Sequence, residues 1–262
     1  MIKNKTFKYI YEGIFGIHKM CLLEKNSFYL DKFYENNQKK IISEVSKKII
    51  SKYPIPSFYK QHTQYLINII SSIRKKKINI LDIGGGWGIG YANCIESFDK
   101  KKLANYKYHI FDLENICTIG KEYFKKKLKL NKNLMYISNL DKIKKTKYDI
   151  IFFGSSLQYF SKPYEVLEKI LKIECNLLVF IDTYLTREKT FFTIQKYYNT
   201  SVPHSFLNKN QFLNFLNKKY KLVSSSYSHT IRLGDVGKIN MNNFPKKYRV
   251  NNSLNLIFNK KI

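Results

Sequence analysis

A cluster of glycines directly after an apolar stretch constrains this chain more than any other feature. Residues 78–83 are mostly apolar and contain Asp82, and they are followed by Gly84, Gly85, Gly86 and Gly88. This pattern predicts a buried strand over 78–83, a helix over 89–98 and a glycine turn between them. Glycine there permits positive φ and lets a ligand approach bare backbone at a helix N-terminus, where unpaired N–H groups favour an anion. We expect this turn to hold a nucleotide-like cofactor, although its spacing differs from the G-x-G-x-x-G of dinucleotide sites.

Apolar patterns after the glycine turn alternate between strand and helix periods. We expect further strands over 107–111, 134–137, 149–153 and 177–182, and helices over 61–73, 115–127 and 163–172. Alternating units of this kind imply a parallel sheet with right-handed crossovers. Beyond an irregular stretch over 184–205 we expect a helix over 209–217, a strand over 221–226, and a final strand over 255–259 that could pair antiparallel at the sheet edge.

The first 60 residues differ in character from the rest. They are rich in Tyr, Phe and Lys and end at Pro54-Ile55-Pro56, where each proline disfavours helix in the residue before it. We therefore divide the chain into a helical and irregular cap over 1–60 and an α/β domain over 61–262, whose length suffices for a full core.

The formal net charge of +28 invites comparison with proteins that bind nucleic acids or anionic membranes. Only four of the basic residues are arginine, and the lysines are scattered over every predicted surface. Sites that bind phosphate tend to favour the bidentate Arg fork. A solvated lysine surface is therefore preferred, and nucleic-acid binding or peripheral contact with an anionic membrane stays as the alternative.

The cysteines and the N-terminus indicate a reduced, cytoplasmic protein. The four cysteines form no C-x-x-C pair and have no histidine at metal-ligand spacing, so we expect no metal. No apolar run approaches the ~20 residues that span a bilayer. Residues 1–23 lack the apolar core and cleavage site of a secretory signal.

A second cofactor signal is Asp112, which follows the strand expected over 107–111 and lies 26 residues after Gly86. A carboxylate in this place can accept both ribose hydroxyls of an adenosine ligand. Glu114 competes for the same role, and Asp112 could instead cap the helix that begins near Asn115. Ser138, after the next strand, is expected near the adenine edge, although residues of its kind also form turns.

The strand expected over 149–153 runs into Gly154-Ser155-Ser156-Leu157-Gln158-Tyr159. In an open α/β sheet the ligand lies outside the carboxyl ends of the strands, near the point where strand order reverses. We therefore expect Ser155, Ser156 and Gln158 to border the cofactor. A helix cap for the serines and core packing for Tyr159 are the alternatives.

Together these segments resemble the class I S-adenosylmethionine-dependent methyltransferases. More narrowly, the chain is similar to a bacterial methyltransferase family often associated with surface-polysaccharide biosynthesis. The similarity covers about residues 78–226. Besides the motifs already described, it rests on Phe111-Asp112 with Gly120, Pro163-Tyr164, Ile181-Asp182-x-Tyr184, Thr193-Ile194-Gln195 and Pro203-x-x-Phe206.

The resemblance implies a Rossmann-like fold with a mostly parallel seven-stranded sheet and an antiparallel edge strand. It implies S-adenosyl-L-methionine as cofactor, with its carboxylate at the backbone of 84–88, its ribose at Asp112, and Asp82 orienting the loop or the amino group. It further implies O-methylation of a sugar or other small polar acceptor in cell-surface polysaccharide biosynthesis.

Candidates for the acceptor side lie in the last third of the chain. Asp182 and His204 could take a hydroxyl proton, and Tyr159, Arg187 and Gln195 could contact the acceptor, since a fork of donors matches phosphate or carboxylate. Each has a plainer alternative: a turn cap for Asp182, a loop residue for His204, and a solvated side chain for Arg187.

Two other enzyme classes compete with this interpretation. An NAD-dependent oxidoreductase also binds adenosine with a glycine loop and an acid, but this loop lacks the G-x-x-G half, and no Tyr-x-x-x-Lys pair stands where a reductase needs it. An RNA or DNA methyltransferase fits the charge, but Ser155-Ser156-Leu157-Gln158 is not the Asn/Asp-Pro-Pro-aromatic motif of the enzymes that methylate nucleobase amino groups.

Overall fold

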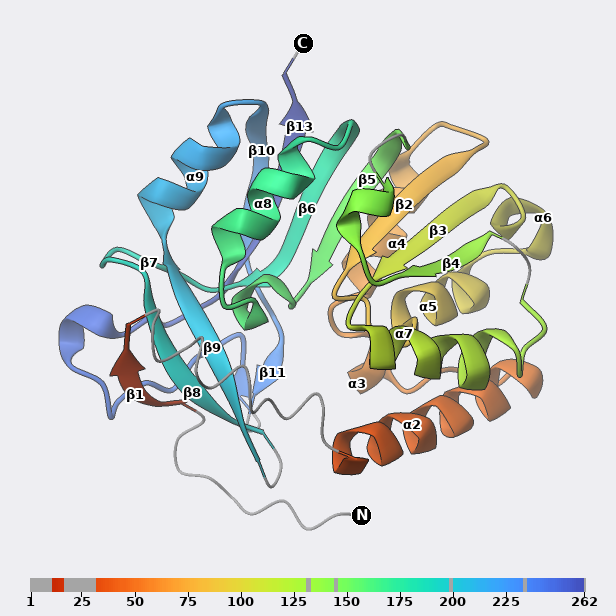
Figure 1. Ribbon diagram of the computed structural model, residues 1–262, viewed down its shortest axis with the longest axis horizontal. Helices are drawn as coiled ribbons and strands as arrows, with labels where there is room; N and C mark the ends of the chain where they lie inside the picture. Colours follow the sequence, from red (N-terminus) through yellow and green to blue (C-terminus); the bar gives the residue numbers. More distant parts are fainter. Residues whose placement is uncertain are drawn as a thin grey trace.

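The main body of the molecule is a seven-stranded sheet with helices on both faces (Figure 1). This computed structural model describes residues 11–16, 32–130, 133–143, 146–197, 200–232 and 235–261. The strand order is β10-β13-β6-β5-β2-β3-β4. The strands are β2 (Ile78–Ile83), β3 (Tyr106–Phe111), β4 (Leu134–Ile137), β5 (Tyr148–Gly154), β6 (Cys175–Thr183), β10 (Tyr220–Tyr227) and β13 (Leu254–Lys260).

Strand pairing confirms the expected Rossmann-like architecture. β2 pairs in parallel with β3 on one side and β5 on the other, β3 pairs with β4, and β5 pairs with β6. β13 is antiparallel to both β6 and β10, so the edge pairing is antiparallel, with β10 outermost and β13 second. The strand order reverses at β2, which places the switch point of the sheet at the glycine turn.

Helices cover each face of the sheet because successive strand residues point to opposite sides. Ile150 and Phe152 of β5 pack in one core cluster, whereas Ile151 and Phe153 pack in the other. The first cluster includes side chains of α2 (Lys32–Ile50), α4 (Gln64–Ser72), α5 (Ile89–Ser97) and α7 (Glu114–Ile119). The second includes side chains of α8 (Pro163–Leu171) and α9 (Lys209–Asn217).

The helices and strands expected between 61 and 182 are all present, with small shifts at their ends. The helix expected over 115–127 is divided, because α7 continues as a π-helical turn, η2 (Gly120–Lys125). Short additional elements are α3 (Ser57–Lys60), α6 (Lys100–Leu103), η3 (Leu140–Ile143), η4 (Leu157–Tyr159), β11 (Ile231–Arg232), β12 (Asp235–Val236) and η5 (Lys246–Tyr248).

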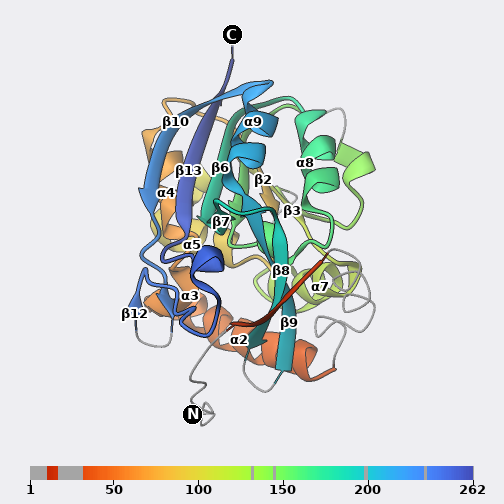
Figure 2. The same cartoon turned by 90° about the vertical axis from the view of Figure 1, so that its left-hand side faces the viewer.

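The irregular stretch expected over 184–205 was a wrong prediction. This segment forms β7 (Leu185–Thr186), β8 (Phe191–Tyr197) and β9 (Thr200–Asn208), which join β1 (Tyr11–Phe15) in a second sheet of order β1-β8-β9-β7 (Figure 2). Pro203 of β9 lies opposite Ile194 of β8, and β7 pairs with Leu207 and Asn208 of β9. In the described part of the chain, no strand pairs with the other side of β9 at Pro203, so the N–H that proline lacks is tolerated there, as at a sheet edge.

The N-terminal segment packs directly on the main body. Ile42 and Val45 of α2 are fully buried in the same core cluster as β2 and β5, and β1 pairs with β8. Residues 1–10 and 17–31, and with them Cys21, lie outside the described residues, and the division at residue 60 stays a prediction. Among the described helices, none combines the length and the apolar character that crossing a bilayer requires.

Candidate cofactor and acceptor site

The glycine turn after β2 has the backbone conformation that its sequence predicts. Gly84, Gly86 and Gly88 have φ of +69°, +60° and +113°, values that residues with a β-carbon rarely adopt. A β-carbon at Gly84 would lie 2.5 Å from Cβ of Ser156, whereas one at Gly86 would meet no heavy atom within 4 Å. Gly84 is thus required for close packing, and Gly86 presents bare backbone to open space.

An aromatic support holds the turn from the side of β4. The Tyr136 hydroxyl donates to the carbonyl of Trp87 at 2.6 Å. A β-carbon at Gly120, where η2 begins, would lie 2.3 Å from the Tyr136 ring. The π-helical turn therefore starts where glycine makes room for the side chain that fixes the loop, as π-helical turns often do at functional sites.

Asp82 lies beneath the turn and supports it. Its carboxylate is buried and accepts a hydrogen bond of 2.6 Å from the Tyr108 hydroxyl. A β-carbon at Gly85 or Gly90 would approach this carboxylate to 2.6 or 2.8 Å. Burial raises the pKa of Asp82 to about 7, against the lowering effect of the Tyr108 hydrogen bond. Of the two roles expected for Asp82, these contacts favour orienting the loop.

Asp112 joins the end of β3 to the glycine turn. Its Oδ2 accepts from the Gly86 N–H at 2.8 Å, and its Oδ1 accepts from the Leu113 N–H at 2.8 Å. Burial raises the pKa of Asp112 to about 6, and the two backbone hydrogen bonds oppose the rise. Asp112 does not cap α7, whose N-cap position is Leu113 and has no side-chain cap. Its carboxylate stands beside Gly86, where a β-carbon would meet open space and where a ribose-binding acid is expected.

The other residues expected near an adenosine lie at the same edge. Ser138 follows β4 and is exposed, and Ile137 before it accepts the Asp112 N–H at 3.2 Å. Glu114 is exposed in the first turn of α7. No described contact joins the side chain of Ser138 or Glu114 to the glycine turn.

The segment after β5 contacts the turn from the opposite side. The Ser156 hydroxyl donates to the Ile83 carbonyl at 2.5 Å. Ser155 has φ of +58°, which is rare for serine, and its hydroxyl accepts from Nε2 of Gln158 at 2.9 Å. The Gln158 Oε1 is buried without a hydrogen-bond partner among the described residues. The structure therefore brings Ser155, Ser156 and Gln158 together beside the loop, and their contact with the cofactor stays a prediction.

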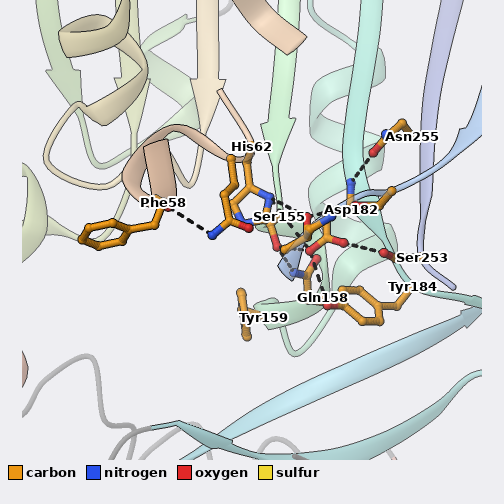
Figure 3. Close-up of polar contacts among 12 residues, drawn as sticks. Phe58, His62, Ser155, Gln158, Tyr159, Asp182, Tyr184, Ser253 and Asn255 are labelled. Atoms are coloured by element: carbon orange, nitrogen blue, oxygen red, sulfur yellow. Dashed lines mark hydrogen bonds and ion pairs between the residues drawn. The ribbon is translucent and has the colours of Figure 1, made fainter. Parts of the chain in front are cut away.

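Asp182, at the end of β6, is the centre of a polar cluster (Figure 3). It is 1% exposed and has φ of +57°. Its carboxylate accepts from the hydroxyls of Ser155 at 2.9 Å, Tyr184 at 3.3 Å and Ser253, and its N–H donates to Oδ1 of Asn255 at 3.0 Å. Asp182 is therefore not a turn cap. It is a buried hydrogen-bond acceptor for hydroxyls that follow β5 and β6 and precede β13.

His62 reaches this cluster from the N-terminal side of the chain, and sequence reasoning missed it. Its Nδ1 lies 4.0 Å from Oδ2 of Asp182 and 3.4 Å from Oγ1 of Thr230 (Figure 3 shows His62 above Asp182). No local motif marks His62, because both partners are more than 100 residues away in the sequence.

His204 lies in β9 and not in a loop. It is fully buried among the rings of Tyr11, Tyr159, Tyr184 and Phe206, with ring centroids 4.3 to 5.6 Å away. Neither ring nitrogen has a hydrogen-bond partner among the described residues. Burial lowers the pKa of His204 to about 3, so the imidazole is neutral.

Two of the residues expected at the acceptor meet beside His204, and one lies apart. The Tyr159 hydroxyl donates to Oε1 of Gln195 at 2.9 Å. Arg187 is exposed after β7, and its carbonyl accepts from the side chain of Asn208, the N-cap of α9. No described contact joins its guanidinium to the Asp182 cluster or to His204.

A metal centre is not evident in the part of the chain that the structure describes. No group of three or more His, Cys, Asp or Glu side chains there could hold a metal ion. Cys94, Cys117 and Cys175 are buried and reduced. The polar groups at the glycine turn are backbone N–H donors and one carboxylate that accepts hydrogen bonds, and this combination suits an adenosine-containing ligand.

Comparison with known proteins identifies the fold. No family model and no curated protein sequence matches the chain. The magnesium protoporphyrin IX methyltransferase of Synechocystis PCC 6803 with bound SAM is similar in structure, with 9% identity, 78% of this chain and 81% of that chain covered, and a TM-score of 0.52. The same protein with bound SAH gives 8% identity, coverage of 79% and 84%, and a TM-score of 0.50. The chain therefore has the Rossmann-like methyltransferase fold.

Proposed function

We propose that this protein is an S-adenosyl-L-methionine-dependent methyltransferase. The observation that carries the proposal is the pairing of the open backbone at Gly86 with the Asp112 carboxylate, at the switch point of a methyltransferase fold. When bound, this cofactor supplies a methyl group activated by its sulfonium. The similar structures crystallised with bound SAM or SAH support the same ligand.

The residues of the turn fit the cofactor. Backbone N–H groups at the start of α5 suit its carboxylate, and Asp112 can accept ribose hydroxyls on the lone pairs that Gly86 and Leu113 leave available. Ser138 extends this edge toward the adenine. Ser155, Ser156 and Gln158 close the opposite side.

The acceptor site lies where the second sheet, of order β1-β8-β9-β7, meets the ends of β5 and β6. Tyr159, Gln195 and His204 supply polar atoms there, and among the described residues Gln158 Oε1 and both His204 nitrogens are buried without hydrogen-bond partners. An unsatisfied buried polar group costs about 1–3 kcal/mol, so a polar acceptor that bonds these atoms gains affinity. We propose a small polar acceptor, a sugar of cell-surface polysaccharide biosynthesis, which is O-methylated in the cytoplasm.

Within this proposal His204 forms hydrogen bonds with the acceptor molecule and does not remove a proton from it. Its pKa, lowered to about 3 by burial, leaves it without basicity at neutral pH, yet its neutral ring still offers one donor and one acceptor. Arg187, exposed beyond β7, contributes only if the acceptor is long enough to reach it.

Calorimetric titration tests the cofactor, and label transfer tests the acceptor. We expect S-adenosylhomocysteine to bind and NADH not to bind. Incubation with methyl-labelled S-adenosylmethionine should then label a nucleotide-sugar or cell-envelope fraction. Binding of NADH without binding of S-adenosylhomocysteine would favour the oxidoreductase alternative, and label appearing in RNA or DNA would favour a nucleic-acid acceptor.

A further inference from the structure

The His62–Asp182 pair lies at the end of the sheet next to the proposed cofactor site. Contacts link it to the glycine turn in two steps: Gly84 packs on Ser156, and the adjacent Ser155 donates to Asp182. We infer that His62, oriented by Asp182, accepts the proton of the acceptor atom that is methylated. This inference rests on the proposed function.

The segment that carries His62 is fixed to the helix that follows the glycine turn. Glu96 of α5 accepts from the Ile55 N–H at 2.7 Å and from Lys60 Nζ at 2.6 Å. The Asn93 side chain, also in α5, donates to the Thr63 hydroxyl at 3.2 Å. His62 therefore lies between two anchored points and keeps its position relative to the glycine turn.

Asp182 is arranged to act on His62 and not on the acceptor. Three hydroxyl donors occupy its carboxylate, and its side chain is 2% exposed. The His62 side chain is 32% exposed, so an acceptor can reach it. A carboxylate behind an imidazole fixes the ring orientation and stabilises the imidazolium that forms when the ring takes a proton. Catalytic contacts often shorten only when substrate binds, so a separation of 4.0 Å is compatible with this role.

The described contacts place groups from several elements around His62. Lys60, on the same segment, is paired with Glu96 of α5. From β6 and its end come Asp182 and Tyr184, and the connection after β10 brings Thr230, with the exposed His229 beside it. Asp182 Oδ2 lies 4.0 Å from the ring nitrogen Nδ1, so this carboxylate stabilises a proton on His62.

The pair also defines the class of acceptor. As the acceptor's O–H or N–H bond breaks, its electron pair forms the new bond to the methyl carbon, the carbon–sulfur pair leaves with S-adenosylhomocysteine, and the proton passes to the ring nitrogen of His62 that faces away from Asp182. A thiolate acceptor has already lost its proton and has no use for this base at neutral pH. The structure therefore favours a hydroxyl or a protonated nitrogen as the methylated group.

Histidine NMR tests the pairing in the full chain saturated with S-adenosylhomocysteine. The ring signals of His62 are assigned by their loss in His62→Asn. We expect Asp182→Asn to move the titration midpoint of His62 down by about one pH unit or more, because the stabilising carboxylate is gone. Asn tolerates the positive φ at this position, and His229→Asn is the matched control that should leave the midpoint unchanged.

Transfer measurements then test the proton step, on the fraction that becomes labelled by methyl-labelled S-adenosylmethionine. His62→Asn should lower the single-turnover rate about 100-fold and remove the rise of rate with pH, with affinity for S-adenosylhomocysteine within about 2-fold of the original protein and of His229→Asn. An unchanged His62 midpoint in Asp182→Asn, or an unchanged rate and pH profile in His62→Asn, overturns the inference while the methyltransferase proposal stands. Failure of the original protein to bind S-adenosylhomocysteine overturns the proposed function itself.

Discussion

The Ser155 hydroxyl donates a 2.9 Å hydrogen bond to Asp182, and both residues have left-handed backbone conformations, at φ of +58° and +57°. They end two adjacent parallel strands, β5 and β6, beside the glycine turn. Such conformations cost free energy and tend to persist at functional sites, where the surrounding structure holds them. Here the polar cluster around Asp182 supplies that support.

Substitutions at Ser155 should separate backbone strain from the hydrogen bond. Ser155→Ala and Ser155→Gly both remove the hydroxyl that Asp182 and Gln158 use, but only glycine adopts positive φ without strain. We expect Ser155→Gly to be more stable than Ser155→Ala by about 1 kcal/mol, measured by urea denaturation. Equal stability of the two variants would contradict a strained conformation at this position.

Two neighbouring glycines should respond differently to alanine. A β-carbon at Gly86 meets open space, whereas one at Gly85 meets the Asp82 carboxylate at 2.6 Å. Gly86→Ala should therefore remain folded with a loss of about 1 kcal/mol, and yet lose at least about 10-fold in affinity for S-adenosylhomocysteine, since the β-carbon occupies the ligand's approach. Gly85→Ala should be the less stable variant in thermal unfolding. A Gly86→Ala protein with undiminished affinity would contradict the proposed ligand position.

Asp112 should make cofactor affinity depend on pH. Its pKa is raised to about 6 by burial, and ribose hydroxyls donate to the ionised form. Affinity for S-adenosylhomocysteine should consequently rise from pH 5 to pH 7 and then level off. Asp112→Asn should remove this rise and weaken binding about 10-fold or more. Calorimetry at several pH values measures both effects, and Glu114→Gln, which changes an exposed acid two residues away, should leave both unchanged.

The titration of Asp82 should make the folded protein less stable as the pH rises. Its folded pKa of about 7 lies above the ordinary aspartate value of 3.8, so between these values the folded protein holds a proton that the unfolded chain releases. The stabilising contribution is fully present below about pH 4 and is lost as the pH rises through 7, a change of roughly 4 kcal/mol.

Asp82→Asn removes this titration and keeps an oxygen for the Tyr108 hydroxyl. The unfolding free energy of Asp82→Asn should therefore increase relative to that of the original protein as the pH rises from 4 to 8. Chemical denaturation across this range provides the measurement, with Glu165→Gln on the exposed face of α8 as the control. A constant difference between Asp82→Asn and the original protein would show that Asp82 does not titrate in this window.

The sequence by itself determined the parts that depend on local geometry. Glycines at 84, 86 and 88 define a turn with positive φ, and apolar periods of two and of about 3.6 residues define the strands and helices around it. From these, the parallel sheet and the positions of Asp112, Ser155 and Gln158 at one edge follow, because parallel strands end at the same edge.

Only the tertiary structure decided the acceptor side. Thr193, in a segment expected to be irregular, pairs with His204 of β9 and donates to the Glu12 carbonyl of β1, 181 residues earlier. His62 meets Asp182 across 120 residues. Such contacts depend on how distant elements pack, and no local period records them. The glycine turn is thus encoded in neighbouring residues, whereas the burial of His204 and the pairing of His62 with Asp182 arise only when separate parts of the chain meet.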